Sequence, residues 1–494
     1  MKLKRYTDTG FKAATALLLP TALILSFTVS DYYIFNRIGE FNFVFVFSQW
    51  VKKAGLLLLP LAVFYKKKSC ADIAKYILPP FVILSCILFG KFFDVTMLTG
   101  ASNADEVYAH INEFIPKAAN MALYFIQCAL YLAICAYLFV RDGYKVNGKS
   151  FIWLPFAFIA CMPLNIFENF FDINNIPANS FLRFKNFTLW HFLAILILAG
   201  FTIGSYYFLK NKTKEKQHQF LAAAAIVLLI QYHSKDSIVM GDGYNVYRTV
   251  FACIPLFICN IGVYVACISV FLKKRVLYAI AFFVHAAGAV SVFVYFGKDE
   301  MSNYGIFCSY SILYFCLTHC LLFALSVMPT ALGHYKYRHK DCIIPLVYYF
   351  AVIILASISS ALVSSASMEF TVTTPSGKYT LDGYSGWDDK LCEWLRPNYA
   401  FTQINPLPFE VPMWKLTIWR YDLNALYILG LYAAYVGIFY AMNGAYFAFL
   451  AIRKKVLKKA SEPQIAIRLS TEAASETAVT DEHTTDKTDE EEKV

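Results

Sequence analysis

Residues 257–298 read FICNIGVYVACISVFLKKRVLYAIAFFVHAAGAVSVFVYFGK, two apolar runs joined by a short basic link. Each run approaches the roughly 20 residues that an α-helix needs to cross the hydrocarbon core of a bilayer. Short loops rich in Lys and Arg are typical of the cytoplasmic side of a membrane protein. The stretch therefore predicts a hairpin of two transmembrane helices.

The same pattern recurs along most of the chain. The 494 residues are 58% hydrophobic and only 16% charged, a composition that excludes a soluble globular protein. The net charge of +10 needs no nucleic acid partner, because the basic residues fall in short loops between apolar runs. We predict an all-α polytopic membrane protein with about 12 transmembrane helices. The predicted spans are about 11–30, 43–65, 74–95, 117–140, 150–170, 188–209, 218–232, 248–271, 275–297, 305–328, 342–365 and 423–452.

The loops predict an orientation. Basic loops alternate with loops that contain acidic residues, which indicates a cell-membrane protein with both termini cytoplasmic. The long segment 366–422 then lies outside, either as a lid over a site or as an ordered insert. The tail, residues 460–494, is acidic and lacks aromatic residues, so we expect a disordered cytoplasmic segment.

The hairpin has a second copy earlier in the chain. Residues 50–91 align with 257–298 without a gap, including Gly55 with Gly262, a shared Phe-x-Lys-Lys and a terminal Phe-Gly-Lys. We interpret this as a duplication. It predicts a degenerate five-helix repeat in the N-terminal half, residues 1–170, and a seven-helix bundle at residues 188–452.

The two copies differ in their polar residues. The aligned pairs are Cys259 with Lys52, Asn260 with Lys53, His285 with Leu78, and His319 with Ala129. This comparison indicates that the C-terminal half alone keeps a polar intramembrane set. It favours a function in residues 188–452 and a scaffolding role for residues 1–170.

Cys259, His285 and His319 each fall near the middle of a predicted span. Successive helices run in opposite directions, so we expect the three side chains at a common depth. Cys259 and His319 fit a nucleophile and its general base. Asn260 fits a group that orients the substrate or donates a hydrogen bond to an oxyanion. We expect it to act on a different atom from the one that Cys259 attacks, because neighbours on a helix point about 100° apart. The alternative is packing, since free Cys is commonly buried and His or Asn can bond between helices.

Other candidate residues and cofactors are few. His191 is expected either at the membrane interface or at the rim of the site. The 13 cysteines follow no CxxC or zinc-ligand spacing, and the histidines are scattered. We therefore expect no metal and no cofactor. Membrane lipids are the expected substrate or solvent, and the sequence does not indicate protein partners.

The C-terminal half resembles the YwaF-like integral membrane family over about residues 188–452. The resemblance is carried by WHFLAIL in the sixth span, IPLFICN in the eighth, His319 in the tenth, and NYAFTQINPLP at 398–408. Some eukaryotic relatives of that family are phospholipid acyltransferases that use a Cys and a His. The resemblance implies that Cys259 is the nucleophile, that His319 is its base, and that Asn398 and Tyr399 lie at the mouth of the site. Many members carry His two residues before the Cys, where this sequence has Phe257.

These observations favour a phospholipid or lysophospholipid acyltransferase with an intramembrane Cys-His pair. A transporter built from two related halves is one alternative, because polar residues at mid-membrane suit transport. A non-catalytic membrane scaffold or sensor is the other, because the sequence contains no specific catalytic signature.

Overall fold

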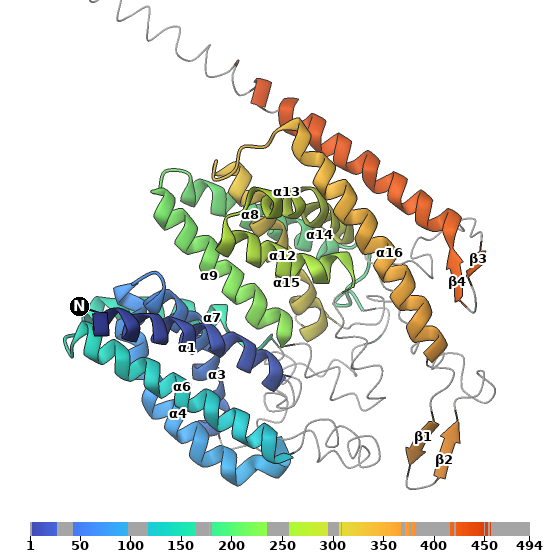
Figure 1. Ribbon diagram of the computed structural model, residues 1–494. Helices are drawn as coiled ribbons and strands as arrows, with labels where there is room; N and C mark the ends of the chain where they lie inside the picture. The colour runs from blue at the N-terminus through green and yellow to red at the C-terminus, as the bar shows by residue number, and fades with distance from the viewer. Residues whose placement is uncertain are drawn as a thin grey trace, which may run out of the picture. The chain divides into compact units, whose positions relative to one another are not determined.

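The computed structural model is a helical protein (Figure 1). It describes residues 2–26, 43–96, 117–164, 177, 180–234, 256–294, 306–307, 309–366, 371–374, 377–380, 415–418, 421–448, 450–452 and 455. The chain divides into two compact units, Met1–Ala433 and Ala434–Val494. The predicted acidic tail, residues 460–494, lies outside the described residues.

Within the residues that the structure describes, the first half of the larger unit contains six helical elements. They are α1 (Lys2–Ser26), α3 (Phe43–Val63), α4 (Lys68–Thr96), α6 (Lys117–Asp142), the 3-10 turn η1 (Gly148–Trp153) and α7 (Leu154–Ala160). α3 and α4 form the hairpin predicted from residues 50–91, and both α1 and α6 pack against it.

The second half begins with α8 (Leu189–Leu209) and α9 (Lys214–His233). The remaining helical elements are α12 (Ile258–Leu272), α13 (Arg275–Ile280), the π-helical turn η4 (Ala281–His285), α14 (Ala286–Val294), α15 (Tyr310–Ala331), the 3-10 turn η5 (His339–Cys342) and α16 (Ile343–Ala366). Two antiparallel hairpins follow, β1 (Thr371–Thr374) with β2 (Gly377–Thr380), and β3 (Lys415–Ile418) with β4 (Tyr421–Asn424). They fall in or beside the predicted exofacial segment 366–422, most of which lies outside the described residues. A last helix runs from Ala425 to Ile452.

Nine helices in the described part of the chain are long and apolar enough to cross a membrane. They are Asp8–Ser26, Phe43–Val63, Lys68–Phe89, Met121–Asp142, Leu189–Leu209, Arg275–Val294, Ile312–Ala331, His339–Ser360 and Ala425–Ile452. The polytopic helical class is therefore confirmed, while the count of about 12 is not.

The three remaining predicted spans explain the difference. The fifth is a short helix, Gly148–Ala160, and the eighth is α12 with 15 residues. The seventh, α9, has 20 residues but starts with the polar sequence KEKQHQ. α9 packs against α3, α12 and α15, so it is buried by protein on several sides. A helix in that position does not need the apolar surface that lipid demands.

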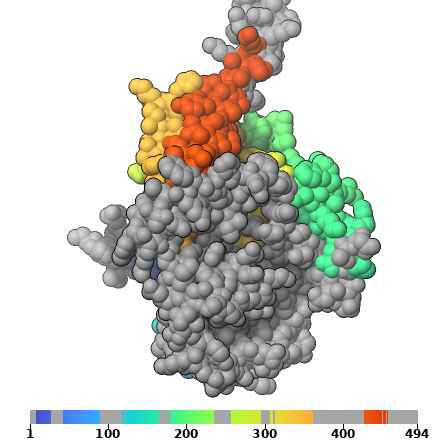
Figure 2. All heavy atoms as spheres, turned by 90° about the vertical axis from the view of Figure 1, so that its right-hand side faces the viewer, coloured from blue at the N-terminus to red at the C-terminus, as the bar shows by residue number. Residues whose placement is uncertain are grey.

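The outer surface suits contact with lipid. On α8 the large apolar side chains Phe192, Leu196 and Ile203 are each more than half exposed. The green segment around residue 200 lies at the surface in Figure 2. An apolar face of this extent on a helix of spanning length is expected to meet hydrocarbon.

The two hairpins make equivalent close contacts. A Cβ atom added to Gly55 would lie 2.9 Å from Leu78, and one added to Gly262 would lie 2.7 Å from His285. The alignment pairs Gly55 with Gly262 and Leu78 with His285, so both hairpins cross at corresponding positions. This agreement supports the predicted duplication, although the repeat as a whole stays a prediction.

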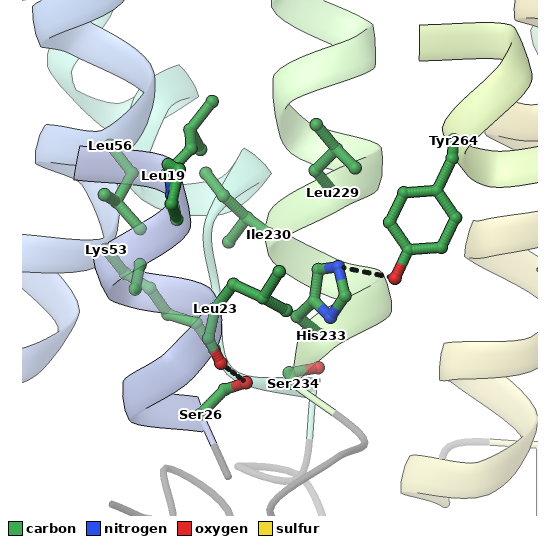
Figure 3. Close-up of a pocket in the computed structure, with 12 residues that line it drawn as sticks. Leu19, Leu23, Ser26, Lys53, Leu56, Leu229, Ile230, His233, Ser234 and Tyr264 are labelled. Atoms are coloured by element: carbon green, nitrogen blue, oxygen red, sulfur yellow. Dashed lines mark hydrogen bonds between the residues drawn. The ribbon is translucent and has the colours of Figure 1, made fainter. Parts of the chain in front are cut away.

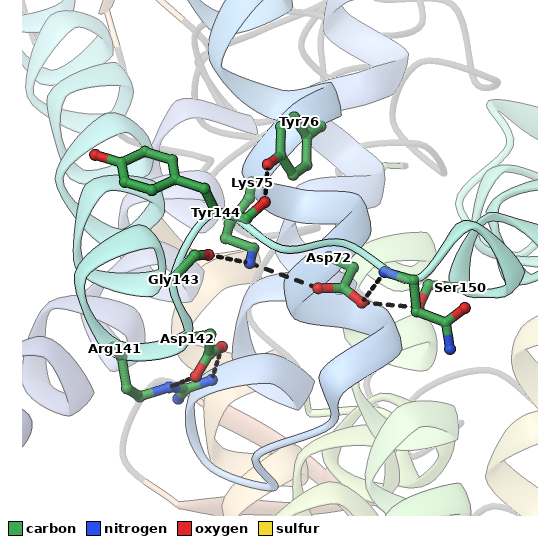
Figure 4. Close-up of polar contacts among 9 residues, drawn as sticks. Asp72, Lys75, Tyr76, Arg141, Asp142, Gly143, Tyr144 and Ser150 are labelled. Atoms are coloured by element: carbon green, nitrogen blue, oxygen red, sulfur yellow. Dashed lines mark hydrogen bonds and ion pairs between the residues drawn. The ribbon is translucent and has the colours of Figure 1, made fainter.

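A buried ion pair fixes the loop after α6 to the start of α4 (Figure 4). Asp72 and Lys75 lie 3.5 Å apart with both side chains fully buried. Lys75 donates to the carbonyl of Gly143 at 2.8 Å, and Asp72 accepts from the Ser150 hydroxyl at 2.9 Å. The pair therefore joins the start of α4 to the segment 143–150, which is far from it in the sequence.

We predict that Asp72→Ala lowers the free energy of unfolding by about 3–5 kcal/mol, because it leaves Lys75 buried without its counter-charge. Unfolding of the purified protein in detergent, followed by circular dichroism, measures the change. Lys12→Ala removes the more exposed Lys12–Asp8 pair and is the matched control, with an expected cost below about 1 kcal/mol. Equal effects of the two substitutions would contradict the structural role of Asp72.

Candidate functional site

Cys259 lies in the first turn of α12, which begins at Ile258. The prediction that it sits halfway along a helix is wrong, because the helix starts about ten residues later than the predicted span. Pro255 stands just before this start, and proline favours the beginning of a helix over its interior. The first turn of a helix carries partial positive charge and backbone N–H groups that bind anions. Cys259 is half-buried at that position.

Asn260 is closer to Cys259 than helix geometry alone predicts. The Cys259 thiol donates to the Asn260 side-chain carbonyl, with Sγ and Oδ1 3.7 Å apart. The expectation that these neighbours serve different atoms of a substrate stays a prediction, since the observed contact joins the two side chains to each other. The Cα–Cβ directions of the two residues differ by about 100°, but the Asn260 side chain turns back toward the thiol through its own torsion angles.

His285 holds the first turn of α12 in place. Its Nδ1 donates to the carbonyl of Ile258 at 2.9 Å, and its Nε2 accepts from the Tyr348 hydroxyl at 3.2 Å. The ring is only 1% exposed and lies over Gly262, where a Cβ would meet it. Both ring nitrogens are thus engaged, which indicates a positioning role in place of proton transfer.

This contact also sets the depth of Cys259. His285 is near the middle of the membrane-spanning helix Arg275–Val294. The carbonyl that it binds belongs to Ile258, the residue before Cys259. The first turn of α12 therefore lies level with the middle of a helix of spanning length. His285 closes the π-helical turn η4, a feature that is frequent at functional sites.

His319 lies near the middle of α15 with its ring in a fixed orientation. Nδ1 is 2.8 Å from the carbonyl of Phe315, one turn earlier. A carbonyl only accepts, so Nδ1 carries the proton and the lone pair of a neutral imidazole is on Nε2. The side chain is 7% exposed. An imidazole in this tautomer is prepared to accept a proton through Nε2.

His191 is a buried structural histidine at the start of α8. Its Nδ1 accepts from the backbone N–H of Phe187 at 2.8 Å, so its Nε2 must carry the proton that is donated to the carbonyl of Phe293 at 2.7 Å. The Phe293 ring lies edge-on to His319, with ring centroids 6.4 Å apart. The structure thus brings both histidines to Phe293, His191 at its backbone carbonyl and His319 at its ring.

Two predicted rim residues, Asn398 and Tyr399, lie outside the described residues. In the described part of the chain, no group of three or more His, Cys, Asp and Glu side chains is arranged to hold a metal ion. Two cysteines that flank His319, Cys316 and Cys320, are buried in an apolar cluster with Phe293.

The alignment of the two hairpins did not reveal a polar cluster in the N-terminal half. Lys52 and Lys53 are 5% and 7% exposed in the middle of α3. The Lys52 ammonium lies 3.7 Å from the centre of the Tyr124 ring. Gln49 donates to the Tyr124 hydroxyl at 2.7 Å and to Ser85 at 3.1 Å. The expectation of polar intramembrane residues in the C-terminal half alone is therefore wrong. The two adjacent lysines inside an apolar run were the sequence feature that could have predicted this cluster.

A scan of protein-family models matches residues 186–443 to the TMEM164 family, just over half of the 494 residues. The chain belongs to the TMEM164 family. The match begins just before α8 and includes α12 and α15, so Cys259, His285 and His319 all lie in the TMEM164 family region. This region nearly coincides with the predicted YwaF-like region, 188–452, whereas the YwaF-like relation itself stays a prediction.

Two other comparisons found no relatives. No curated protein and no solved structure matches the chain. The family establishes a multi-pass transmembrane protein, and its name assigns no reaction.

We predict that Gly262→Ala destabilises the protein by about 1–3 kcal/mol, because the added Cβ would lie 2.7 Å from His285 Nδ1. Thermal unfolding of the purified variant measures the loss. Gly204→Ala is the matched control, since a Cβ there meets nothing within 4 Å, and alanine favours a helix over glycine by roughly 0.5–1 kcal/mol. A Gly262→Ala protein as stable as the Gly204→Ala protein would contradict the close contact with His285.

Proposed function

We propose that the protein is a membrane-embedded acyltransferase that moves a fatty acyl chain between phospholipids. Cys259 is the acyl-accepting nucleophile and His319 is its general base. The observation that supports this most is the position of Cys259 in the first turn of α12, which His285 binds from the middle of a helix of spanning length. The first turn of α12 offers positive potential to a thiolate and N–H groups to the oxyanion of an ester under attack.

Two further features support the pairing of Cys259 with His319. α12 packs against α15, the helix that carries His319. The tautomer of His319 leaves the lone pair on Nε2, as a general base requires. The N-terminal half offers an analogy, because Lys52, the counterpart of Cys259, contacts Tyr124 in α6. The Leu-Tyr-Phe sequences at 123–125 and 313–315 align Tyr124 with Tyr314, on the turn of α15 before His319.

The reaction proceeds in two balanced steps. In the first, His319 takes the thiol proton, Cys259 attacks the ester carbonyl of a donor phospholipid, a C–S bond forms and the ester C–O bond breaks. The leaving lysophospholipid oxygen takes the proton back from His319. In the second step, the hydroxyl of an acceptor lysophospholipid gives its proton to His319 and attacks the thioester carbonyl. An ester C–O bond forms and the C–S bond breaks, which releases the acylated phospholipid. The Cys259 thiolate then takes the proton back from His319.

Asn260 and His285 assist without forming bonds to substrate. The Asn260 carbonyl accepts the Cys259 S–H and so orients the thiol. His285 fixes the first turn of α12 through Ile258 and so holds the N–H groups of that turn. The proposal includes the orientation with both termini cytoplasmic, the cell membrane as location, and Asn398 and Tyr399 at the entrance of the site.

We predict that the purified protein, mixed with a phospholipid carrying a fluorescent acyl chain, forms an acyl adduct that hydroxylamine removes. Cys259→Ala abolishes the adduct because the thiol is absent. His319→Ala slows its formation by about 10²–10⁴-fold, the usual contribution of a general base. In-gel fluorescence after rapid quenching measures the rate.

Cys267→Ala is the matched control, since Cys267 lies two turns later on α12 and its thiol bonds to the carbonyl of Ala225 at 3.3 Å. Its adduct should equal that of the wild type. An adduct that persists in Cys259→Ala would exclude Cys259 as the nucleophile. No adduct with any phospholipid would favour the transporter or the scaffold and sensor alternatives.

A further inference from the structure

The N-terminal half buries two cationic side chains whose presence the proposed acyl transfer does not explain. Lys52 and Lys53 follow one another on α3 and are both at least nine-tenths buried. Ionisable residues inside a membrane are costly and typically mark a pathway or a ligand site. Nothing in the fold of α3 itself requires them, because the aligned helix α12 has Cys259 and Asn260 in their place.

The surroundings of Lys52 compensate its charge only in part. Its ammonium lies over the face of the Tyr124 ring, and the Cys128 thiol is a neighbouring group. A cation over an aromatic ring gains less free energy than the burial of an ammonium costs. In the part of the chain that the structure describes, no carboxylate pairs with Lys52.

Two neighbouring cavities border these lysines. The smaller, of about 70 Å³, is lined by Lys52, Lys53, Gln49, Gln127 and Tyr124 among others. The larger, of about 250 Å³, is lined mainly by apolar side chains of α1, α3 and α9, including Leu19, Leu23, Leu56 and Leu229. Ala22, Ser26, Lys53 and Leu56 line both cavities, so a polar chamber adjoins an apolar one.

Figure 3 shows how the larger cavity is framed. Lys53 extends from α3 alongside Leu23 and Ser26 at the end of α1. On the far side, the His233 ring and the Tyr264 hydroxyl face each other at 3.2 Å. Lys53 thus lies where the apolar chamber meets the polar one.

We propose that the two cavities bind one single-chain anionic amphiphile, with its carboxylate or phosphate between Lys52 and Lys53 and its alkyl chain in the apolar cavity. Positive charge, amide and hydroxyl groups suit an anionic head, and the leucine-lined cavity suits a chain. The larger cavity is below the roughly 300–1,000 Å³ of typical ligand pockets, which favours one chain over the two of a phospholipid. This site does not depend on the chemistry of Cys259.

The test is a titration of the full-length protein in neutral detergent with cis-parinaric acid, a fluorescent fatty acid. The wild type binds it saturably. The double variant Lys52→Met/Lys53→Met binds it about tenfold or more weakly, since it removes charge-assisted hydrogen bonds to the anionic head. Methionine fills similar volume, and replacing a buried charge by an apolar side chain is often neutral or stabilising, so this variant is expected to fold.

Displacement of the bound probe identifies the head group. Palmitic acid as the stronger competitor indicates a carboxylate ligand, and palmitoyl lysophosphatidic acid as the stronger indicates a phosphate ligand; either supports the site. The neutral hexadecanol should compete at least tenfold more weakly than both. Equal competition by hexadecanol would overturn the proposal, because the lysines would then contribute nothing to recognition.

Two single variants keep the test decisive if the double variant fails to fold. Leu23→Trp fills the apolar cavity and should also weaken binding about tenfold. Lys210→Met is the matched control, because Lys210 is exposed at the end of α8 with its ammonium over the Tyr207 ring. Unchanged binding in Leu23→Trp, or equal loss in Lys210→Met, would contradict the site.

Discussion

The close crossing of two helix pairs at glycine is the constraint on which the rest of the structure depends. At Gly55 and Gly262 a side chain of the neighbouring helix lies where a Cβ would otherwise be. Small residues at such crossings let membrane helices approach closely, and this packing takes the place of the hydrophobic force that is missing in lipid. In the second pair the approaching side chain is His285, which reaches the carbonyl of Ile258 only because Gly262 leaves room. The position of Cys259 follows from this contact.

The two halves of the chain stabilise their buried polar side chains in different ways. In the C-terminal half, the imidazoles of His191, His285 and His319 each bond to a backbone carbonyl, which fixes the tautomer. The burial of a neutral imidazole costs little free energy when the ring has such a hydrogen-bond partner. The N-terminal half instead buries full positive charge at Lys52 and Lys53, which is expensive. Of the three, the ring of His319 is the one proposed to transfer a proton, whereas fixed cations suit the binding of an anion.

The start of α12, level with the middle of a helix of spanning length, links the fold to the proposed chemistry. Non-helical backbone at membrane depth is tolerated where protein covers it or where it lines a cavity. At α12 the first turn is supported by His285 and, through His285, by Tyr348 of α16. The support comes from helices that are distant in the sequence. The TMEM164 family region includes all of these elements, so the proposed site is contained within it.

The sequence by itself determined the helical membrane class, the basic links between apolar runs and the alignment of Gly55 with Gly262. These follow from local composition, because a bilayer requires long apolar helices whatever their partners. It also singled out His285 and His319 at mid-span. Only the tertiary structure decided that α12 begins at Ile258, that His285 positions this turn, and that Lys52 faces Tyr124. It also decided that α9 is enclosed by protein and needs less apolar surface than a span facing lipid. Contacts of this kind depend on which helices pack together, and the spacing of residues along one helix does not contain that information.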